Sequence, residues 1–474
     1  MRIASWLRSG WLCLPPILFA MALVGFAYYP GVARNDTIEQ YRQALSGDYT
    51  DWHPPAYAWL WRQLNLIVAG PDSLFLFHLA LYGLGMGAFA LALRHRRDWL
   101  GALLVGGFAL LPITLGYVGI LMKDITMGLL FYAAMGLAFL CRARREALPL
   151  PALALVAGLL LLGSLTRFNG PFAAAPLLVY ALAGPRPAGP VASAGRHLLA
   201  LVALFLLPLL LNHYAFKPQR TGVQLSLLIY DVGGISSRTG RDYFPELGVA
   251  DFPPVNREQC YTPEWWDPYF WGRCDFVFAT VHAQLRDGRL DAPGWWARAV
   301  LDAPAAYIGH RLAHLNQNIR WLMPSGRADV TFLADVPNDL GLAFRPNQAS
   351  YAVRAAGFLQ AATPLGWPAF WLGLAMSWLL LARRLPASPA RGAVVAICAS
   401  VLLYGAGIAV VSVASDLRYH VWTMLGVGVA TAVGTAELRH LRAMTLRGWV
   451  LALSPVGVVV AAGMAWRVLN LPAP

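Results

Sequence analysis

The sequence predicts an all-α polytopic membrane protein with about 11 transmembrane helices. Of its 474 residues, 58% are hydrophobic and only 13% are charged, whereas an ordinary soluble domain carries about a quarter charged residues. The mean hydropathy is +0.52. Eleven stretches approach the roughly 20 apolar residues that a helix needs to cross a bilayer. This composition excludes a soluble enzyme, a disordered protein and a coiled coil.

The predicted spans are separated by short polar or basic loops. A further apolar segment, 54–69, contains Arg62 and Gln63, and we expect it to lie at the membrane interface or to re-enter the membrane because polar groups are costly inside lipid. In chain order the spans are 10–29, 72–93, 99–118, 125–141, 149–166, 170–184, 197–215, 363–382, 392–414, 420–436 and 448–468.

Arginine in alternate loops predicts the orientation, because cytoplasmic loops are enriched in Arg and Lys. Every second loop is basic, so we expect a cytoplasmic N-terminus and a C-terminus on the outside. Sixteen arginines in these loops, set against three acidic residues, account for the net charge of +13. The surplus therefore reports topology and not a nucleic-acid partner. The arginines are Arg2, Arg8, Arg94, Arg96, Arg97, Arg142, Arg144, Arg145, Arg186, Arg196, Arg383, Arg384, Arg391, Arg439, Arg442 and Arg447.

The spans divide the chain into three parts. Residues 1–215 form an N-terminal module of about seven spans with an outside loop at 30–71, and residues 363–474 form a C-terminal module of about four spans. Between them, 216–362 is long enough for a small, mostly helical outside domain.

Two cysteines of the long loop, Cys260 and Cys274, are candidates for a disulfide, because a bacterial periplasm is oxidising. Two unpaired thiols are the alternative.

The first polar cluster follows the first span. Asp36 lies just past the end of that span, where a carboxylate could act as a general base. Alternatively, Asp36 is a helix N-cap, since Glu39 stands where a capping box requires it. The two roles do not exclude each other.

The second cluster precedes a tandem proline. Pro54 and Pro55 cannot lie inside a helix but begin one well, so Asp51 and His53 are held where the chain returns to the interface. They are either a fixed polar site or ordinary residues at a helix start.

Three cations lie at the outer ends of spans. Lys123, next to Asp124, stands between two apolar runs, and Arg167 and Arg418 follow other spans. Arg and Lys bind phosphate, so the three could surround one anionic headgroup if the helices bundle. For any one of them, the alternative is a cation that snorkels to the interface, and Lys123 with Asp124 could simply mark a turn.

No cofactor motif is present. The sequence has neither a P-loop nor a G-x-G-x-x-G pattern. His310 and His314 have helical spacing but lack the glutamate of a zincin motif, which favours a surface or interfacial helix face. The sequence leaves a divalent cation open and does not identify ligands for one.

Taken in order, these motifs resemble the GT-C superfamily of polytopic glycosyltransferases. The likeness rests on Asp36 after the first span, the segment 51–57, Lys123 with Asp124 in a short outside loop, and Arg418 followed by Tyr419. The segment 51–57 is similar to its counterpart in protein O-mannosyltransferases and lipid A aminoarabinose transferases. One departure is Thr37, where mannosyltransferases have the second acidic residue of an Asp-Glu pair.

The resemblance implies a hexosyl- or pentosyltransferase in the bacterial inner membrane. It would move a sugar from a polyprenyl-phosphate carrier to an envelope lipid, glycan or protein on the periplasmic side, among membrane lipids and without nucleic acid. Asp36 would be the general base. The phosphate would be held by Lys123, Arg167 and Arg418, and the sugar or acceptor pocket would be formed by Asp51, His53, Asp124, Asp231 and Tyr419.

Three other functions fit the sequence less well. An O-antigen ligase or polymerase would share the carrier, but Asp36 and His53 fit it poorly. A transporter of lipid-linked sugars often has inverted repeats and polar groups at the midplane, neither of which is visible here. A non-catalytic assembly factor would not need three cations and several carboxylates at one depth.

Overall fold

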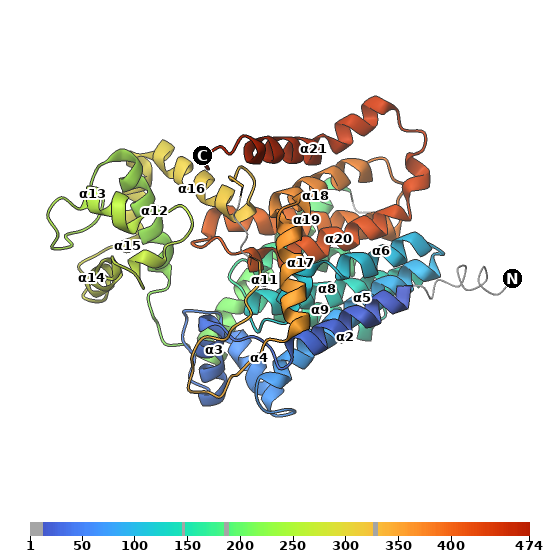
Figure 1. Cartoon of the computed structure of the whole chain (residues 1–474), viewed down its shortest axis with the longest axis horizontal. Helices are drawn as coiled ribbons and strands as arrows, with labels where there is room; N and C mark the ends of the chain where they lie inside the picture. Colours follow the sequence, from blue (N-terminus) through green and yellow to red (C-terminus); the bar gives the residue numbers. More distant parts are fainter. Residues whose placement is uncertain (1–12, 145–146, 184–188, 326–329) are drawn as a thin grey trace. The chain divides into compact units, whose positions relative to one another are not determined.

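The structure is a computed structural model that describes residues 13–144, 147–183, 189–325 and 330–474 (Figure 1). In this part of the chain the regular structure is helical. Its β pairings are isolated bridges, among them those between Val32 and Ile120 and between Trp265 and Ala414. The predicted all-α class is therefore confirmed. The orientation prediction also used Arg2, Arg8, Arg145 and Arg186, which lie outside the described residues.

The chain forms two compact units. The first unit comprises Met1–Pro218, Gly326–Gly405 and Arg418–Ala462, and the second comprises Gln219–Ser325, Ala406–Leu417 and Gly463–Pro474. The division predicted at 216 and 362 does not coincide with these units, because the segment after 326 groups with the first one.

Helices make up most of the first unit. They are α2 (Leu14–Tyr28), α3 (Asn35–Ser46), α4 (Pro55–Asn65), α5 (Pro71–His95), α6 (Trp99–Ala109), α7 (Pro112–Val118), α8 (Lys123–Arg144), α9 (Leu150–Leu165), α10 (Gly170–Leu182), α11 (Pro190–Leu211), η2 (Asn212–Phe216), α17 (Gln348–Ala361), η5 (Pro364–Gly366), α18 (Pro368–Ala382), α20 (Val421–Thr435) and η7 (Leu438–Leu441). Three helices have residues in both units: α19 (Pro389–Val411), η6 (Leu417–His420) and α21 (Leu446–Val468).

The chain is a multi-pass membrane protein. Among the described residues, five helices are long and apolar enough to cross a bilayer: α5, α8, α11 continued by η2, α19 and α21. The helices α6 and α7 are bent by 63° relative to each other. If this pair counts as one span, the number of candidate spans rises to six. Each of the eleven predicted spans overlaps a helix, but several of these helices are shorter than a full crossing, so the number eleven stays a prediction.

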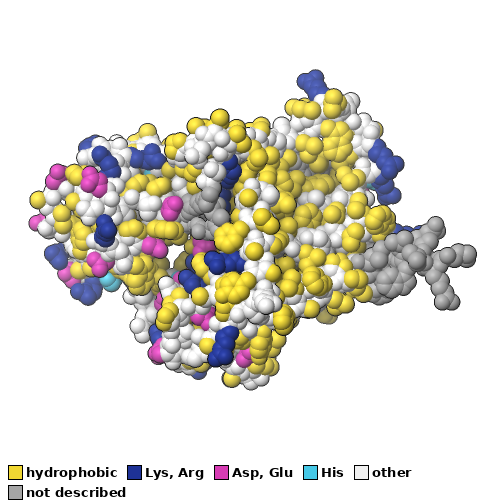
Figure 2. All heavy atoms as spheres, viewed as in Figure 1, with side chains coloured by type: hydrophobic (Ala, Val, Ile, Leu, Met, Phe, Trp, Pro, Cys, Tyr) yellow, Lys and Arg dark blue, Asp and Glu magenta, His cyan; other side chains and the backbone are white. Residues whose placement is uncertain are grey.

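Hydrophobic side chains cover much of the first unit's visible face over its long helices (Figure 2). Phe26 on α2 and Leu359 on α17 are among the exposed ones. A surface of this kind suits lipid rather than water.

Helix α8 is the buried centre of the first unit. Nearly all of its residues from Lys123 to Phe139 are buried, and it packs against α5, α9 and α20 (Figure 1). Gly85 on α5 and Gly136 on α8 permit the close approach, since a Cβ at Gly136 would lie 2.9 Å from the Gly85 carbonyl oxygen. Small residues at helix contacts are typical of membrane bundles. The buried position of α8 places its first residues inside the unit.

The segment after α2 runs beside the segment before α8. Val32 donates its N–H to the Gly119 carbonyl (2.9 Å) and accepts from the Leu121 N–H (3.0 Å). Gly31 has φ +113°, and a side chain there would clash with Leu121. These bonds fix the entrance to α3 next to the start of α8.

Helix α4 begins at the tandem proline, as predicted, with Pro54 as its N-cap. Arg62, the polar residue inside this apolar segment, donates to the carbonyls of Ala44 (3.2 Å) and Leu45 (3.0 Å) near the end of α3. Trp61 packs against Tyr41 of α3 with ring centroids 4.5 Å apart. The segment is therefore tied to α3, and its location at the membrane interface stays a prediction.

The second unit is also mostly helical. Its remaining helices are α12 (Gln224–Thr239), α13 (Phe252–Val255), η3 (Asn256–Cys260), η4 (Asp267–Tyr269), α14 (Asp275–Arg286), α15 (Ala292–Asp302) and α16 (Pro304–Ile319).

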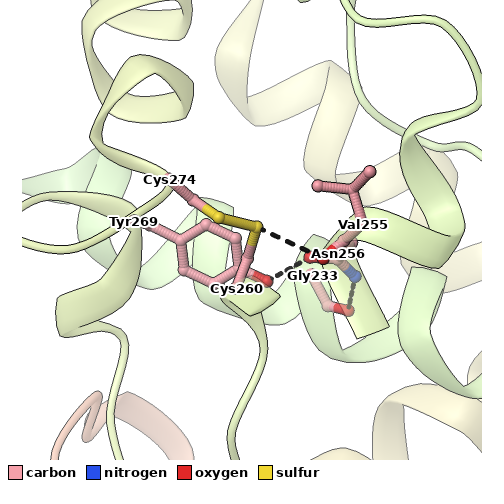
Figure 3. Close-up of a disulfide and its surroundings, with 6 residues drawn as sticks. All are labelled: Gly233, Val255, Asn256, Cys260, Tyr269 and Cys274. Atoms are coloured by element: carbon pink, nitrogen blue, oxygen red, sulfur yellow. Dashed lines mark hydrogen bonds between the residues drawn. A yellow bond between two sulfur atoms is a disulfide. The ribbon is translucent and has the colours of Figure 1, made fainter. Parts of the chain in front are cut away.

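Cys260 and Cys274 form a disulfide with their Cα atoms 5.6 Å apart, which confirms the predicted pair (Figure 3). Beside it, Asn256 donates to the Gly233 carbonyl (2.9 Å) and accepts from the Tyr269 hydroxyl. The disulfide and these bonds join η3, η4 and α12.

Candidate active site

Five charged side chains of the first unit alternate in sign along one chain of contacts, which we call the charge cluster. Lys123 Nζ lies 3.0 Å from Asp36 Oδ2, and Arg418 Nη2 lies 3.2 Å from the same oxygen. Arg418 Nε lies 3.6 Å from Asp124 Oδ2, and Asp124 Oδ1 is paired with Arg167. Arg418 therefore bridges the two carboxylates.

Helix ends supply all members of the charge cluster. Asp36 is near the start of α3, Lys123 and Asp124 begin α8, Arg167 lies between α9 and α10, and Arg418 lies in η6 before α20. The structure thus brings together the three cations that the sequence placed at similar depth. Lys123 and Asp124 have different partners, so a turn marked by a Lys-Asp pair is not what forms.

Tyr419 and Asn169 fix the Arg167 side chain. The guanidinium carbon of Arg167 lies 4.3 Å from the centroid of the Tyr419 ring, a distance typical of a cation–π contact. Arg167 Nε also donates to Asn169 Oδ1 (3.1 Å). Tyr419 is therefore a neighbour of the charge cluster, and its role in the sugar or acceptor pocket stays a prediction.

The charge cluster is partly buried, with Lys123 and Asp124 the most enclosed, and its charges do not balance. The Asp124 side chain is 1% exposed and that of Asp36 is 27% exposed. Counted over the five side chains of the charge cluster, three cations face two carboxylates, a surplus of one positive charge. Because charges interact more strongly away from water, this surplus favours binding of one anionic group.

Asp36 is not the N-cap of α3, so the predicted capping box of Asp36 and Glu39 is wrong. The N-cap is Arg34, whose backbone N–H donates to Thr37 Oγ1 (3.0 Å). Thr37 Oγ1 in turn donates to the Leu121 carbonyl (2.7 Å). Because Thr37 takes the capping role, the Asp36 carboxylate is available to Lys123 and Arg418.

The cations keep Asp36 ionised. Burial alone would raise its pKa, but the charges of Lys123 and Arg418 hold the pKa of Asp36 well below its usual range. While it is paired with Lys123 and Arg418, Asp36 is consequently a weak base.

His53 and Glu39 also lie near Asp36. The sequence marks His53 as a site residue but does not mark Glu39 as one. His53 Nε2 lies 3.9 Å from Asp36 Oδ1 and 3.9 Å from Glu39 Oε2. Burial and the charge of Lys123 lower the pKa of His53 to about 3, so its imidazole is neutral. The signal for Glu39 was its spacing of three residues from Asp36, which places both on one helix face.

Asp51 lies in the bend two residues before His53. Its role in the sugar or acceptor pocket stays a prediction.

Asp231 belongs to the second unit, where it is fully buried in a separate network. Arg311 Nη2 lies 2.5 Å and His310 Nε2 3.3 Å from Asp231 Oδ1, and Trp296 Nε1 donates to Oδ2 (2.8 Å). Gly234 on α12 makes room for His310 of α16, since a Cβ at that position would overlap the imidazole. The network joins α12, α15 and α16, and the role of Asp231 in the sugar or acceptor pocket stays a prediction.

His310 and His314 do not lie on a surface or interfacial face, as the sequence suggested, because α16 packs them into the second unit. His310 Nδ1 contacts the Tyr261 hydroxyl (2.9 Å), and His314 Nδ1 contacts the Tyr230 hydroxyl (3.0 Å) and the Pro263 carbonyl (2.9 Å). Burial lowers the pKa of His314 to about 3.

The side chains present do not fit a divalent cation. Over the ranges that the structure describes, no three His, Cys, Asp or Glu residues gather in a metal-binding group. The carboxylates of the charge cluster are already paired with Lys and Arg, which would repel a metal ion.

Fold and site together define an all-helical, multi-pass membrane protein with a partly buried cationic site at the ends of its helices. No protein-family profile and no curated protein matches the chain. It is similar to solved structures of the Archaeoglobus fulgidus oligosaccharyltransferase. One of these, with a tethered acceptor peptide, has 13% identity and a TM-score of 0.38 over 99% of this chain and 56% of that one. Another, in complex with an inhibitory peptide and a dolichol-phosphate, has 14% identity and a TM-score of 0.37 over 94% of this chain and 56% of that one.

The chain is also similar to ArnT from Cupriavidus metallidurans bound to undecaprenyl phosphate. The identity is 13% and the TM-score 0.29, over 97% of this chain and 89% of that one. Both proteins are members of the GT-C superfamily that the sequence motifs resemble. The chain spans little more than half the length of the oligosaccharyltransferase.

Proposed function

We propose that this chain is an integral membrane glycosyltransferase that moves a sugar from a polyprenyl-phosphate donor to an acceptor at the membrane surface. The observation that carries the proposal is the charge cluster, in which Lys123, Arg167 and Arg418 outnumber two carboxylates by one charge. The sugar is a hexose or a pentose, and the acceptor is an envelope lipid, glycan or protein. The reaction takes place on the periplasmic face of a bacterial inner membrane.

The chemistry of a lipid-linked sugar fits this surplus charge. A sugar attached through a phosphodiester carries one negative charge on its phosphate, and the phosphate gains a second when the sugar leaves. Cations already in place at the leaving oxygen stabilise that growing charge without reorganisation. Arg167 and Arg418 add paired N–H donors suited to phosphate oxygens. The apolar helices around the site would accommodate the polyprenyl tail.

Asp36 is the catalytic carboxylate of this proposal. Its Oδ2 oxygen contacts Lys123 and Arg418, while Oδ1 lies on the side of His53. An ionised carboxylate in this position stabilises the positive charge that develops on the sugar ring as the glycosidic bond breaks. Its Oδ1 oxygen would also be open to an acceptor hydroxyl bound beside His53, which makes Asp36 one candidate for the general base. Asp51, His53 and Tyr419 would shape the sugar or acceptor pocket, and Asp124 orients Arg167 and Arg418.

The proposal is tested with the full chain in lipid nanodiscs and a panel of citronellyl-phosphate monosaccharides that includes hexoses and pentoses. Mass spectrometry would follow the release of citronellyl phosphate, with water or membrane extracts as the acceptor. We expect release from at least one donor and its loss in Arg418→Ala. The matched control is Arg96→Ala, which breaks another ion pair with a buried carboxylate, that with Glu437 (2.6 Å).

If the protein releases citronellyl phosphate from none of these donors, the proposed glycosyltransferase activity is contradicted. Movement of intact donor across the bilayer, without cleavage of its sugar–phosphate bond, would favour a transporter instead. Mass spectrometry of lipids and surface glycans in cells with and without the gene would then identify the sugar and the acceptor.

A further inference from the structure

Glu39 lies beside the charge cluster but does not pair with its cations. It follows Asp36 by three residues on α3, and His53 Nε2 is 3.9 Å from an oxygen of each carboxylate. Glu39 Oε1 accepts from Gln43 Nε2 at 3.3 Å. Among the described residues, no Lys or Arg lies within ion-pair distance of Glu39.

The two carboxylates have opposite surroundings. Asp36 Oδ2 contacts two cations, and its side chain is 27% exposed. The side chain of Glu39 is 43% exposed, so an incoming hydroxyl group can reach it. The neutral imidazole of His53 lies between them and can orient that hydroxyl by a hydrogen bond.

The charged and titratable groups near Glu39 are Asp36 and Arg42 on α3, His53 before α4, and Lys123 at the start of α8. Burial and the charge of Asp36 raise the pKa of Glu39, and Lys123 and Arg42 only partly oppose this. The pKa of Asp36 is held well below its usual range. Of these two carboxylates, Glu39 therefore binds a proton more readily than Asp36. Two carboxylates whose pKa values are driven apart usually divide the acid–base work between them.

We infer that Glu39 is the general base of this site, while Asp36 remains ionised as an electrostatic stabiliser. The inference rests on the proposed glycosyl transfer and changes the role that the sequence assigned to Asp36. It also names the acceptor chemistry: a neutral hydroxyl group, which needs a base to become a good nucleophile.

The step balances with the groups on hand. The acceptor oxygen forms a bond to the anomeric carbon as the bond from that carbon to the phosphate oxygen breaks. The bonding electron pair leaves with the phosphate, which is held by Lys123, Arg167 and Arg418. The hydroxyl proton moves to Glu39 Oε2 and is lost to water through the exposed side of the carboxyl group.

The test compares Glu39→Gln with Asp36→Asn in the full chain in nanodiscs. The probe is a citronellyl-phosphate monosaccharide that the wild-type protein cleaves. Loss of a general base lowers kcat by about 10²–10⁴-fold. We expect that loss in Glu39→Gln, with undecaprenyl phosphate binding and the melting temperature unchanged. Asp48→Asn, an exposed carboxylate just after α3, is the matched control.

The pH profile separates a base from a merely structural residue. In the wild type, kcat should fall as the pH drops through a pKa above 4.5, the ordinary value for glutamate. Glu39→Gln should remove this acid limb, whereas Asp36→Asn should retain it at a lower rate. Formate should restore turnover to Glu39→Ala by acting as the missing base.

Each failure has a different meaning. No donor cleavage by the wild type would overturn the proposed function and the inference with it. Cleavage with an unchanged acid limb in Glu39→Gln, or an acid limb lost only in Asp36→Asn, would overturn the inference alone. If Glu39→Gln does not fold, formate rescue of Glu39→Ala and the pH profile of Glu39→Asp decide in the same way.

Discussion

Lys123 Nζ lies 3.0 Å from Asp36 Oδ2, although the two residues are 87 positions apart in the chain. The pair is positioned by the backbone rather than by the charges alone. Val32 exchanges hydrogen bonds with Gly119 and Leu121, and Thr37 donates to the Leu121 carbonyl. Asp36 is next to Thr37, and Lys123 comes shortly after Leu121. Their side chains therefore meet at the starts of α3 and α8.

Replacing Arg418 by Ala should weaken binding of undecaprenyl phosphate. Hydrogen bonds to charged groups contribute about 1.5–3 kcal/mol each, so we expect a rise in Kd of about tenfold to a hundredfold. Arg418→Lys should recover part of the affinity, because it keeps the charge but not the bridge between Asp36 and Asp124. Titration in nanodiscs by native mass spectrometry would measure this. Equal affinities for Arg418→Ala and the wild type would argue against a phosphate site.

Asp36→Asn should separate binding from turnover. The substitution removes one of two carboxylates facing three cations, so undecaprenyl phosphate should bind as tightly as to the wild type or more tightly. Turnover should nevertheless fall, by about 100-fold or more, because a preorganised charge is lost from the reaction centre. Paired measurements of Kd and kcat on the same protein would check both signs. A loss of affinity together with unfolding would instead indicate a purely structural carboxylate.

Cys274→Ser should destabilise the second unit. The Cys260–Cys274 disulfide closes a loop with a sequence separation of 14, for which chain entropy gives about 3 kcal/mol. Limited proteolysis or thermal melting, with and without a reductant, would detect the change. Cys141→Ser, at a free cysteine, should have little effect and be insensitive to the reductant. Equal stability of the two variants would contradict a structural disulfide.

Asp231→Asn should unfold the second unit without a specific effect on chemistry. The substitution leaves the buried Arg311 without its ion-pair partner, and breaking such a pair costs about 3–5 kcal/mol. Arg311→Met combined with Asp231→Leu should recover stability, because no uncompensated charge remains. A folded Asp231→Asn variant whose turnover has been lost would instead place Asp231 in the sugar or acceptor pocket.

Stability should fall on acidification, in part because of buried histidines. The folded pKa of His53 and of His314 is about 3, below the ordinary value of 6.5, so the unfolded chain binds protons that the folded protein does not. The contribution of these neutral histidines to the free energy of unfolding is therefore fully present above about pH 6.5. It is lost as the pH falls from about 6.5 towards 3, by about 1.4 kcal/mol per pH unit for each histidine. Melting temperatures across this range would test the slope. A His314→Asn variant with an undiminished slope would exclude His314 as a source.

The site residues differ in how far the sequence could predict them. Lys123, Arg167 and Arg418 were found because each is a cation at the end of an apolar run, a local and visible signal. The spacing of Glu39 from Asp36 fits a capping box, so the sequence favours a capping role for Glu39 and does not mark it as a site residue. His310 and His314 were placed on a surface, because helical spacing alone does not say which face of a helix is covered.

The sequence by itself determined the class of protein, the course of the apolar helices and the helix start at Pro55. These depend on composition and on local backbone restraints, which act over a few residues. Only the tertiary structure decided that Thr37 stabilises the start of α3 while Asp36 pairs with two cations, and that Asp231 belongs to another network. Those outcomes depend on which chain segments lie within a few ångströms of each other. Packing around α8 and the backbone bonds of Val32 set those distances, and no local pattern records them.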